Sequence, residues 1–195
     1  MESIYKKIWQ LAIPFYKKGR SYDIIQVRWM MKEGDRIADL EKIDKKLLLP
    51  LIILHDVGYS KVKIKDPHIK DKDTKRVHMR EGAKIAAKIL EQVKYDPELA
   101  KIIVRYISIH DNWVFGDDWP YKSSREMALF NDLDFLWVTS SFRAFAANGK
   151  SMGLTPKNFY KFWESDEKLT RRPFCCSATQ KIFDESMRRI KQQLT

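Results

Sequence analysis

A histidine and an aspartate, His55 and Asp56, directly follow the apolar run 47–54. Imidazole and carboxylate are both strong metal ligands, and they stand where a hydrophobic helix is expected to end. Two more of the chain's four histidines, His78 and His110, also fall at the edges of predicted helices. Helix ends that open on a shared cavity bring side chains from distant parts of a sequence together. The pattern predicts one polar site.

The residue types in this predicted site suit phosphate-ester hydrolysis. Metals that catalyse this reaction need oxygen or imidazole ligands and open positions for water and substrate. Adjacent helical residues diverge by about 100°, so His55 and Asp56 can flank one ion or two neighbouring ions. A single histidine beside an apolar helix is more often structural, and His68, in a charged segment, is given that interpretation.

The overall composition predicts one globular domain with an anionic partner. The 195 residues suit a single domain, and 44% hydrophobic residues suffice for a core. The net charge of +11 favours nucleotides, nucleic acid or an acidic membrane, although a solvated lysine-rich surface explains it equally well. The two cysteines, Cys175 and Cys176, are adjacent, which argues against a disulfide framework. No apolar run reaches membrane length, so we expect a soluble cytoplasmic protein without a membrane partner.

The periodicity of the apolar residues is helical and predicts an all-α bundle of six or more helices. Helices are expected over 2–18, 22–40, 45–54, 78 to about 93, 97 to about 109, 125 to as far as 145, and 178–194. Asp44, Asp96 and Ser124 are suited to cap three of them. Charged residues dominate 60–76, which is interpreted as a solvated loop, and 112–124 is interpreted as a second loop.

The His-Asp pair also carries a resemblance to a known family. His55-Asp56-Val57-Gly58 after an apolar helix resembles the signature of the HD-domain superfamily of metal-dependent phosphohydrolases. His-x-x-x-Gly-Ala-x-Ile-Ala from His78 resembles the second block of its small members, and Ile-Ser-Ile-His ending at His110 resembles the third. Four such blocks in the right order are more specific than any one of them.

The last of these blocks is Glu126 followed eight residues later by Asp134, which resembles the family's final ligand motif. The resemblance covers about 22–137. Residues 139–195 lie outside it and are interpreted as additional C-terminal helices of a single HD-type domain, 1–195. The implied fold is the all-α HD-domain bundle.

The resemblance implies a site for one or two divalent ions, with Mn, Mg, Fe, Co, Ni and Zn as candidates. His55, Asp56 and Asp134 would hold a first ion, and Asp56 would bridge to a second held by His78 and His110. In members with one ion, the latter two histidines instead face the substrate phosphate. Asp56, His78 and His110 would then be the catalytic residues, with the metal lowering the pKa of a water that attacks phosphorus.

Three further residues are candidates for binding the substrate. Lys75 and Arg80 flank His78, and Glu126 stands in the last block. A solvated cluster of charges accounts for the two cations equally well. Glu126 can also serve as a favourable carboxylate in the first turn of its helix.

The chain departs from the family pattern before the His-Asp pair. The family usually supplies a metal-binding histidine about thirty residues upstream, and Gln26 stands there in this chain. No histidine precedes His55, so a shift in register cannot restore the ligand. An amide carbonyl is a weak, neutral ligand that suits Mg²⁺ or Mn²⁺ better than Zn²⁺. The first site is therefore weakened, empty or filled by a harder ion.

The sequence leaves three functions open. The first is a metal-dependent phosphohydrolase acting on a small phosphorylated metabolite, with a nucleotide favoured. The second, motivated by Gln26, is a catalytically degenerate domain that binds a nucleotide or nucleic acid without turnover. The third, suggested by charge alone, is a nuclease. A homo-oligomer is compatible with each of them.

Overall fold

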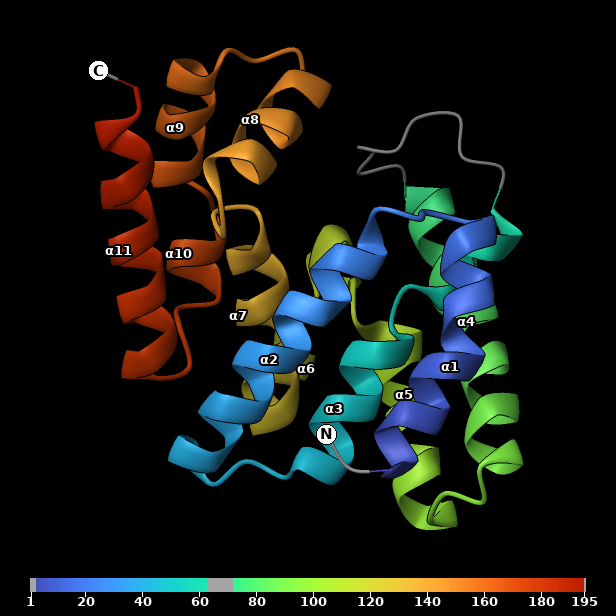
Figure 1. Cartoon of the computed structure of the whole chain (residues 1–195). Coiled ribbons are helices and arrows are strands. Elements are labelled where there is room, and N and C mark those ends of the chain that lie inside the picture. The colour runs from blue at the N-terminus through green and yellow to red at the C-terminus, as the bar shows by residue number, and fades with distance from the viewer. Residues whose placement is uncertain (1–2, 63–71, 195) are drawn as a thin grey trace.

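The computed structural model describes residues 3–62 and 72–194. Within these ranges the chain is helical and contains no strand, which confirms the predicted all-α fold (Figure 1). The elements are α1 (Ser3–Lys18), α2 (Asp23–Glu41), α3 (Lys45–Leu54), η1 (Val57–Lys61), α4 (Lys72–Gln92), α5 (Pro97–Ile109), η2 (Asn112–Phe115), α6 (Trp119–Ser123), α7 (Arg125–Trp137), α8 (Phe142–Ser151), α9 (Pro156–Glu164), α10 (Lys168–Arg171) and α11 (Ser177–Gln192).

The predicted N-caps are confirmed, because each side chain satisfies amide groups in the first turn of its helix. Asp44 accepts a hydrogen bond from the amide of Lys46 at the start of α3. Asp96 accepts two at the start of α5, and Ser124 accepts one from Met127 at the start of α7.

Three of the predicted element boundaries are wrong. Helix α4 begins at Lys72, so His78 lies inside it rather than at its start. Its first turns are charged and carry no apolar stripe, and the ion pair of Asp73 with Arg76 follows helical spacing. Residues 60 and 61 of the predicted loop belong to η1, and 63–71, with His68, lie outside the described residues.

The other two errors lie around α7. The segment 112–124 is not a plain loop, because it holds η2 and α6. The helix predicted to reach as far as 145 ends at Trp137, and α8 begins after Ser141, whose hydroxyl accepts from the amide of Ala144. Apolar residues on both sides of this break hide it from a periodicity argument.

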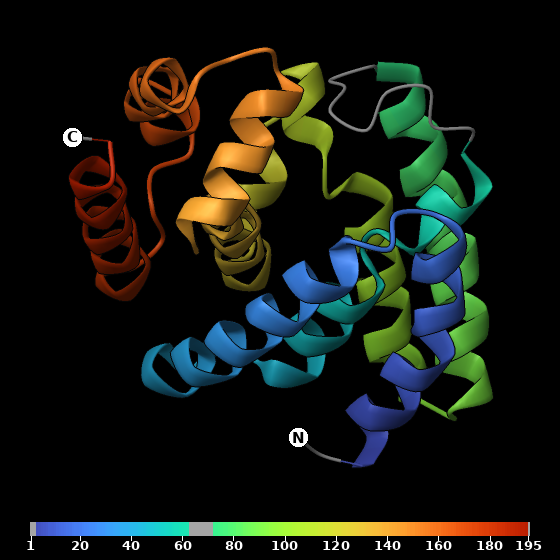
Figure 2. The ribbon, with the colours of Figure 1, turned by 45° about the horizontal axis from the view of Figure 1, so that its top comes forward.

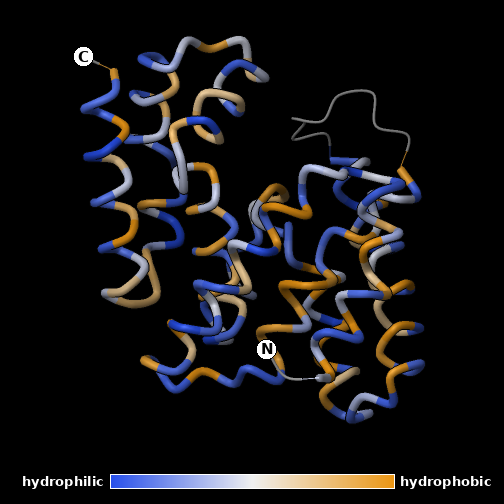
Figure 3. Tube along the Cα trace, viewed as in Figure 1, coloured by the Kyte–Doolittle hydropathy of each residue, from blue (hydrophilic) through white to orange (hydrophobic). Residues whose placement is uncertain are grey.

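Helix α3 lies at the centre of the fold and contacts α1, α2, α5 and α7. Its residues from Leu48 to Leu54 are all buried, and it is the most apolar stretch of the trace (Figure 3). Helices α9 to α11 lie on one side of α7 and α8 lies beyond its C-terminal end, whereas α1, α4 and α5 lie on the other side (Figure 1 and Figure 2). The apolar end of α3 therefore delivers His55 and Asp56 to the interior.

A hydrophobic cluster separate from the main core around α3 holds the C-terminal helices against α7. It is formed by Leu136, Phe145, Phe159, Trp163, Phe183, Met187 and Ile190. A buried ion pair joins the same elements, since Lys168 Nζ lies 2.5 Å from Asp132 Oδ1 and both side chains are almost fully buried. The other oxygen of Asp132 accepts from the amide of Cys175 and the hydroxyl of Thr179. The additional helices are thus anchored to the helix that carries Asp134.

Gly58 allows η1 to lie directly against α4. A Cβ atom at this position would lie 1.9 Å from the carbonyl oxygen of His78 and 2.5 Å from the amide nitrogen of Gly82. Only a residue without a side chain permits this approach. The glycine of the His-Asp-Val-Gly sequence therefore brings Asp56 beside His78.

None of the helices in the described part of the chain combines the length and apolar character that a membrane crossing requires.

Candidate metal centre

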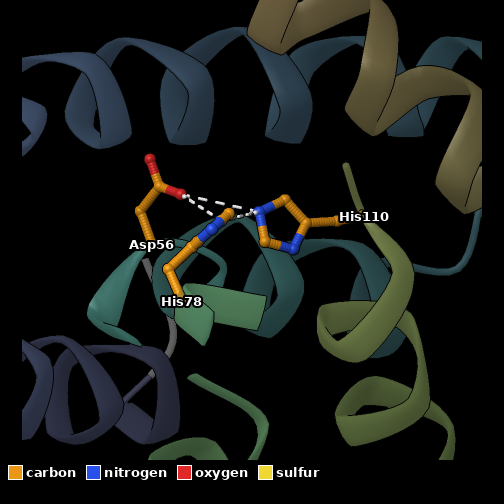
Figure 4. Close-up of side chains that lie close together, drawn as sticks. All are labelled: Asp56, His78 and His110. Atoms are coloured by element: carbon orange, nitrogen blue, oxygen red, sulfur yellow. Dashed lines mark hydrogen bonds and ion pairs between the residues drawn. The ribbon is translucent and has the colours of Figure 1, made fainter. Parts of the chain in front are cut away.

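Three side chains from three parts of the chain converge at one point (Figure 4). Asp56 follows α3, His78 lies in α4 and His110 follows α5. Asp56 Oδ1 is 3.5 Å from Nε2 of His78 and 3.5 Å from Nε2 of His110. The two Nε2 atoms are 3.1 Å apart. All three residues are buried, so their polar atoms have little access to bulk water.

Backbone carbonyl groups orient the three histidines of the region. Nδ1 of His110 lies 2.7 Å from the carbonyl oxygen of Ile107, and Nδ1 of His55 lies 2.9 Å from that of Ile52. Nδ1 of His78 makes the corresponding, longer contact to Thr74. A neutral imidazole that donates from Nδ1 has its lone pair on Nε2. The Nε2 lone pairs of His78 and His110 are therefore directed at each other.

This arrangement fits a bound cation. Two facing lone pairs 3.1 Å apart repel each other unless a proton or a metal ion lies between them. Metal–imidazole bonds of ~2.1 Å at angles between 90° and tetrahedral would place two such nitrogens about 3.0–3.4 Å apart. The carboxylate of Asp56 supplies the negative charge. Asp56, His78 and His110 can therefore hold a divalent ion.

A second His-Asp pair repeats the backbone geometry of the first. His55 and His110 each end a helix in α-helical conformation. Asp56 has φ −103° and ψ 5°, Asp111 has φ −108° and ψ 18°, and each precedes a 3-10 helix. Both carboxylates are thereby turned toward His78, with Asp111 Oδ2 3.3 Å from its Nε2.

Asp111 already has a cationic partner. Lys75 Nζ lies 2.6 Å from Asp111 Oδ2, and the indole nitrogen of Trp113 donates to the other oxygen at 3.0 Å. Burial alone would raise the pKa of the Asp111 carboxyl, but the charge of Lys75 holds it well below its usual range. Asp111 therefore borders the candidate ion position as an ionised group whose charge is already balanced.

The charges at the centre favour metal binding near neutral pH. Burial lowers the pKa of His78 to about 4, so its Nε2 lone pair is free. Burial would raise the pKa of Asp56, but the positive charges of His55 and Arg20 keep it well below its usual value. His78 is therefore a neutral imidazole and Asp56 is an ionised carboxylate, which are the forms of these side chains that bind metal.

The other predicted ligand set is arranged differently. Gln26 donates a 2.6 Å hydrogen bond from Nε2 to Asp134 Oδ1, so two of the residues at this position bind each other. Nε2 of His55 is buried without a well-aligned hydrogen bond, 3.3 Å from Asp56 Oδ2. Burial opposes protonation of His55, yet the charges of Asp56 and Asp134 raise its pKa to about 9. A protonated imidazole is not a metal ligand.

A buried arginine adds to the positive charge beside the centre. The Arg20 guanidinium pairs with Asp23 at 3.0 Å and lies 4.3 Å from the centre of the Tyr59 ring. That ring stacks on His78, with 4.2 Å between centroids and 10° between planes. Nε of Arg20 and Oδ2 of Asp23 are buried without hydrogen-bond partners. Tyr59 thus lies between the guanidinium of Arg20 and the imidazole of His78.

The three predicted substrate-binding residues lie in different places. Lys75 borders the centre through Asp111. Arg80 is exposed on α4 and pairs with Glu81. Glu126 accepts a hydrogen bond from the hydroxyl of Ser124 in the first turn of α7, eight residues before Asp134. At ~1.5 Å per residue this places Glu126 about 12 Å along the helix from Asp134.

The sequence argument missed Asp111, Arg20 and Tyr59. Asp111 had a visible signal, because His110-Asp111 after an apolar helix repeats the motif of His55-Asp56. Arg20 and Tyr59 had none, because an arginine after a helix and a tyrosine near a glycine are common. Their contribution depends on the contact of η1 with α1 and α4.

Comparison with known families places this geometry in context. The family described as HD domain matches residues 27–127, which is more than half of the chain and contains Asp56, His78 and His110. The chain belongs to the HD-domain family, whose members are generally metal-dependent hydrolases. Gln26 and Asp134 lie just outside the matched region. No curated protein and no solved structure matches the chain.

Proposed function

We propose that this protein is a metal-dependent phosphohydrolase that acts on a small phosphorylated metabolite, with a nucleotide as the favoured substrate class. One observation carries the proposal: Oδ1 of Asp56 and the two facing Nε2 atoms of His78 and His110 gather at one buried point. The family match supports a hydrolytic reaction. The basic net charge of +11 supports an anionic substrate.

Each residue of the centre has a role in this proposal. Asp56, His78 and His110 would hold one divalent ion, which would supply positive charge to lower the pKa of water and to neutralise phosphoryl oxygens. Ring stacking with Tyr59 fixes the position of His78, and Asp111, with its Oδ2 3.3 Å from Nε2 of His78, borders the ion position. Hydrogen bonds to backbone carbonyls keep the imidazole lone pairs directed at the ion.

Two cations lie close enough to take part in phosphate binding. Lys75 is 2.6 Å from Asp111 and Arg20 lies against Tyr59, so both border the centre without being ligands. Burial would lower the pKa of Lys75, but Asp111 raises it well above its usual value, so the ammonium stays charged. A phosphate group that reaches the ion would meet these charges in a site of low dielectric, where they act strongly.

Phosphate release from a panel of nucleotides and sugar phosphates tests the proposal. The protein is stripped of metal and reloaded separately with Mn²⁺, Co²⁺, Ni²⁺, Fe²⁺, Mg²⁺ or Zn²⁺. We expect hydrolysis with at least one ion, and we expect Asp56→Ala to abolish it. Asp73→Ala, which removes an exposed carboxylate from α4, is the control and should retain the rate. Equal rates for Asp56→Ala and the unmodified protein would refute the proposed centre.

A second candidate function is binding of a nucleotide or nucleic acid without turnover. It is favoured by the hydrogen bond between Gln26 and Asp134, which engages two residues of the first predicted ion position. A protein of this kind would bind nucleotide tightly, contain no metal on elemental analysis and release no phosphate from the whole panel. Binding to single-stranded nucleic acid that weakens steeply with salt would identify the polymer as the ligand.

A further inference from the structure

A cavity of about 500 Å³ lies between α1, α2 and α3, and it contains none of the residues of the metal centre. Its apolar walls are formed by Tyr5, Trp9, Val27, Met31, Leu49 and Ile53. Ligand-binding cavities in proteins typically measure about 300–1,000 Å³ and are mostly apolar with a few polar groups that fix orientation. The size and the walls of this cavity therefore suit a small molecule with an apolar body.

Positive charge borders the cavity on one side. Arg28 and Lys32 both line it and are four residues apart on α2, so they lie one helical turn from each other. Within 3–62 and 72–194, neither makes an ion pair. The Arg28 guanidinium lies 6.0 Å from the centre of the Trp9 ring. The positive charge of Arg28 is therefore next to an apolar part of the cavity wall.

The remaining charged residues of the lining neutralise each other. Lys45 lies 2.7 Å from Asp35 and 2.6 Å from Asp39, so its charge is balanced. Among the residues that the structure describes, Asp35 is the only carboxylate that lines the cavity, and it is the partner of this lysine. The net charge presented to a ligand is therefore that of Arg28 and Lys32.

We propose that this cavity binds an amphiphilic carboxylate, a molecule with a medium-length aliphatic or aromatic body and one anionic group. The apolar body lies against Trp9, Met31 and Leu49, and the carboxylate lies between Arg28 and Lys32. An uncharged or cationic molecule of the same shape would bury the same apolar area without the two ionic contacts. The site is therefore expected to bind the carboxylate more tightly than the uncharged or cationic molecule.

The cavity is lined by residues close in sequence to those around the metal centre. Val27 in its wall is next to Gln26, and Ile53 is two residues before His55. The carbonyl oxygen of Ile53 also accepts a hydrogen bond from Tyr16 of α1 at 3.0 Å. A ligand held between α1, α2 and α3 thus contacts the helix that carries Gln26 and the helix that precedes His55 and Asp56.

Calorimetric titration of the full chain with dodecanoate, below its micelle concentration, tests the proposal. We expect saturable binding of one molecule per chain. Dodecyltrimethylammonium has the same chain with the opposite charge and should bind at least tenfold more weakly. Acetate, which has the charge without the chain, should give no saturable binding. Equal affinity for dodecanoate and dodecyltrimethylammonium, or no saturable binding of dodecanoate, would overturn the proposal.

Two variants locate the binding site. Arg28→Gln combined with Lys32→Gln should weaken dodecanoate binding at least about fourfold, since each partly exposed ion pair contributes roughly two- to fivefold. Arg36→Gln on the same helix removes an exposed charge that does not line the cavity and should leave affinity unchanged. Met31→Trp, which fills the cavity, should also weaken binding. Unchanged affinity in the folded double variant, verified by circular dichroism, would refute the assigned site.

Discussion

Replacing Gly58 with alanine tests whether the contact of η1 with α4 builds the metal centre. The added Cβ would lie 1.9 Å from the carbonyl oxygen of His78 and 2.5 Å from the amide nitrogen of Gly82. Both are backbone atoms, so no side-chain rotation relieves the clash. Since non-bonded atoms normally lie about 3.5–4.0 Å apart, even a tight contact of about 3.0 Å requires η1 and α4 to separate by about 1 Å.

This separation should affect both stability and metal binding. Inserting an extra carbon into a packed interior typically costs about 1–3 kcal/mol, and two backbone clashes place Gly58→Ala near ~3 kcal/mol. Asp56 lies two residues before Gly58, so its 3.5 Å distance to His78 should lengthen with the same movement. Metal–ligand distances tolerate only about ±0.2 Å. We therefore expect affinity for Mn²⁺ to fall at least tenfold.

Urea denaturation measures the first effect and calorimetric titration with Mn²⁺ measures the second. Gly153→Ala is the matched control, because its Cβ would meet nothing within 4 Å although its φ is +70°. It should cost only the strain of a left-handed residue, about 1–2 kcal/mol, and leave metal affinity unchanged. If Gly58→Ala has the stability and the Mn²⁺ affinity of the unmodified protein, the close approach does not position Asp56 and the reasoning fails.

Three further predictions concern the neighbouring network. Gln26→His places an imidazole beside Asp134 and His55 and should raise the metal content, measured by elemental analysis, by one ion per chain. Gln26→Met is the control and should not raise it. The same metal content in both variants would contradict this expectation. Lys168→Met leaves the buried carboxylate of Asp132 without its cation and should lower the free energy of unfolding, measured by urea denaturation, by about 3 kcal/mol. A loss of less than about 1 kcal/mol would contradict this prediction. In metal-free protein, His78 has a pKa of about 4, below the ~6.5 of an exposed imidazole. The contribution of neutral His78 to the free energy of unfolding is therefore complete above pH ~6.5 and is lost, by about 3 kcal/mol, as the pH falls through about 4. A His78→Gln variant whose stability shows the same acid dependence would show that another group titrates.

Local signals predicted much of the helical framework. Asp44, Asp96 and Ser124 are good caps followed by periodic apolar residues, and the helices begin where these residues stand. The same method failed at the start of α4, where charged residues give no apolar period. It also failed at residue 138, where apolar residues continue through a turn. Periodicity detects a buried face, and these two places lack a clear contrast between faces.

The sequence likewise predicted only part of the candidate site. The ordered residues Asp56, His78 and His110 were identified from type, order and position, and the structure brings all three together. Glu126 was singled out by the same resemblance, and it lies at the far end of α7 from Asp134, bonded to Ser124. A motif gives the order of residues along the chain, but the helix that carries them decides how far apart they lie.

The sequence by itself determined the chemistry that is available, because ligand type, helix caps and the glycine after the His-Asp pair are properties of single residues and their neighbours. Only the tertiary structure decided how those groups are used. Packing places the amide of Gln26 against Asp134, the ammonium of Lys75 against Asp111 and the ring of Tyr59 against His78. Each contact joins residues distant in sequence, and the buried contact of Lys75 with Asp111 helps to keep that carboxyl ionised. The protonation of the centre is therefore a property of the folded chain.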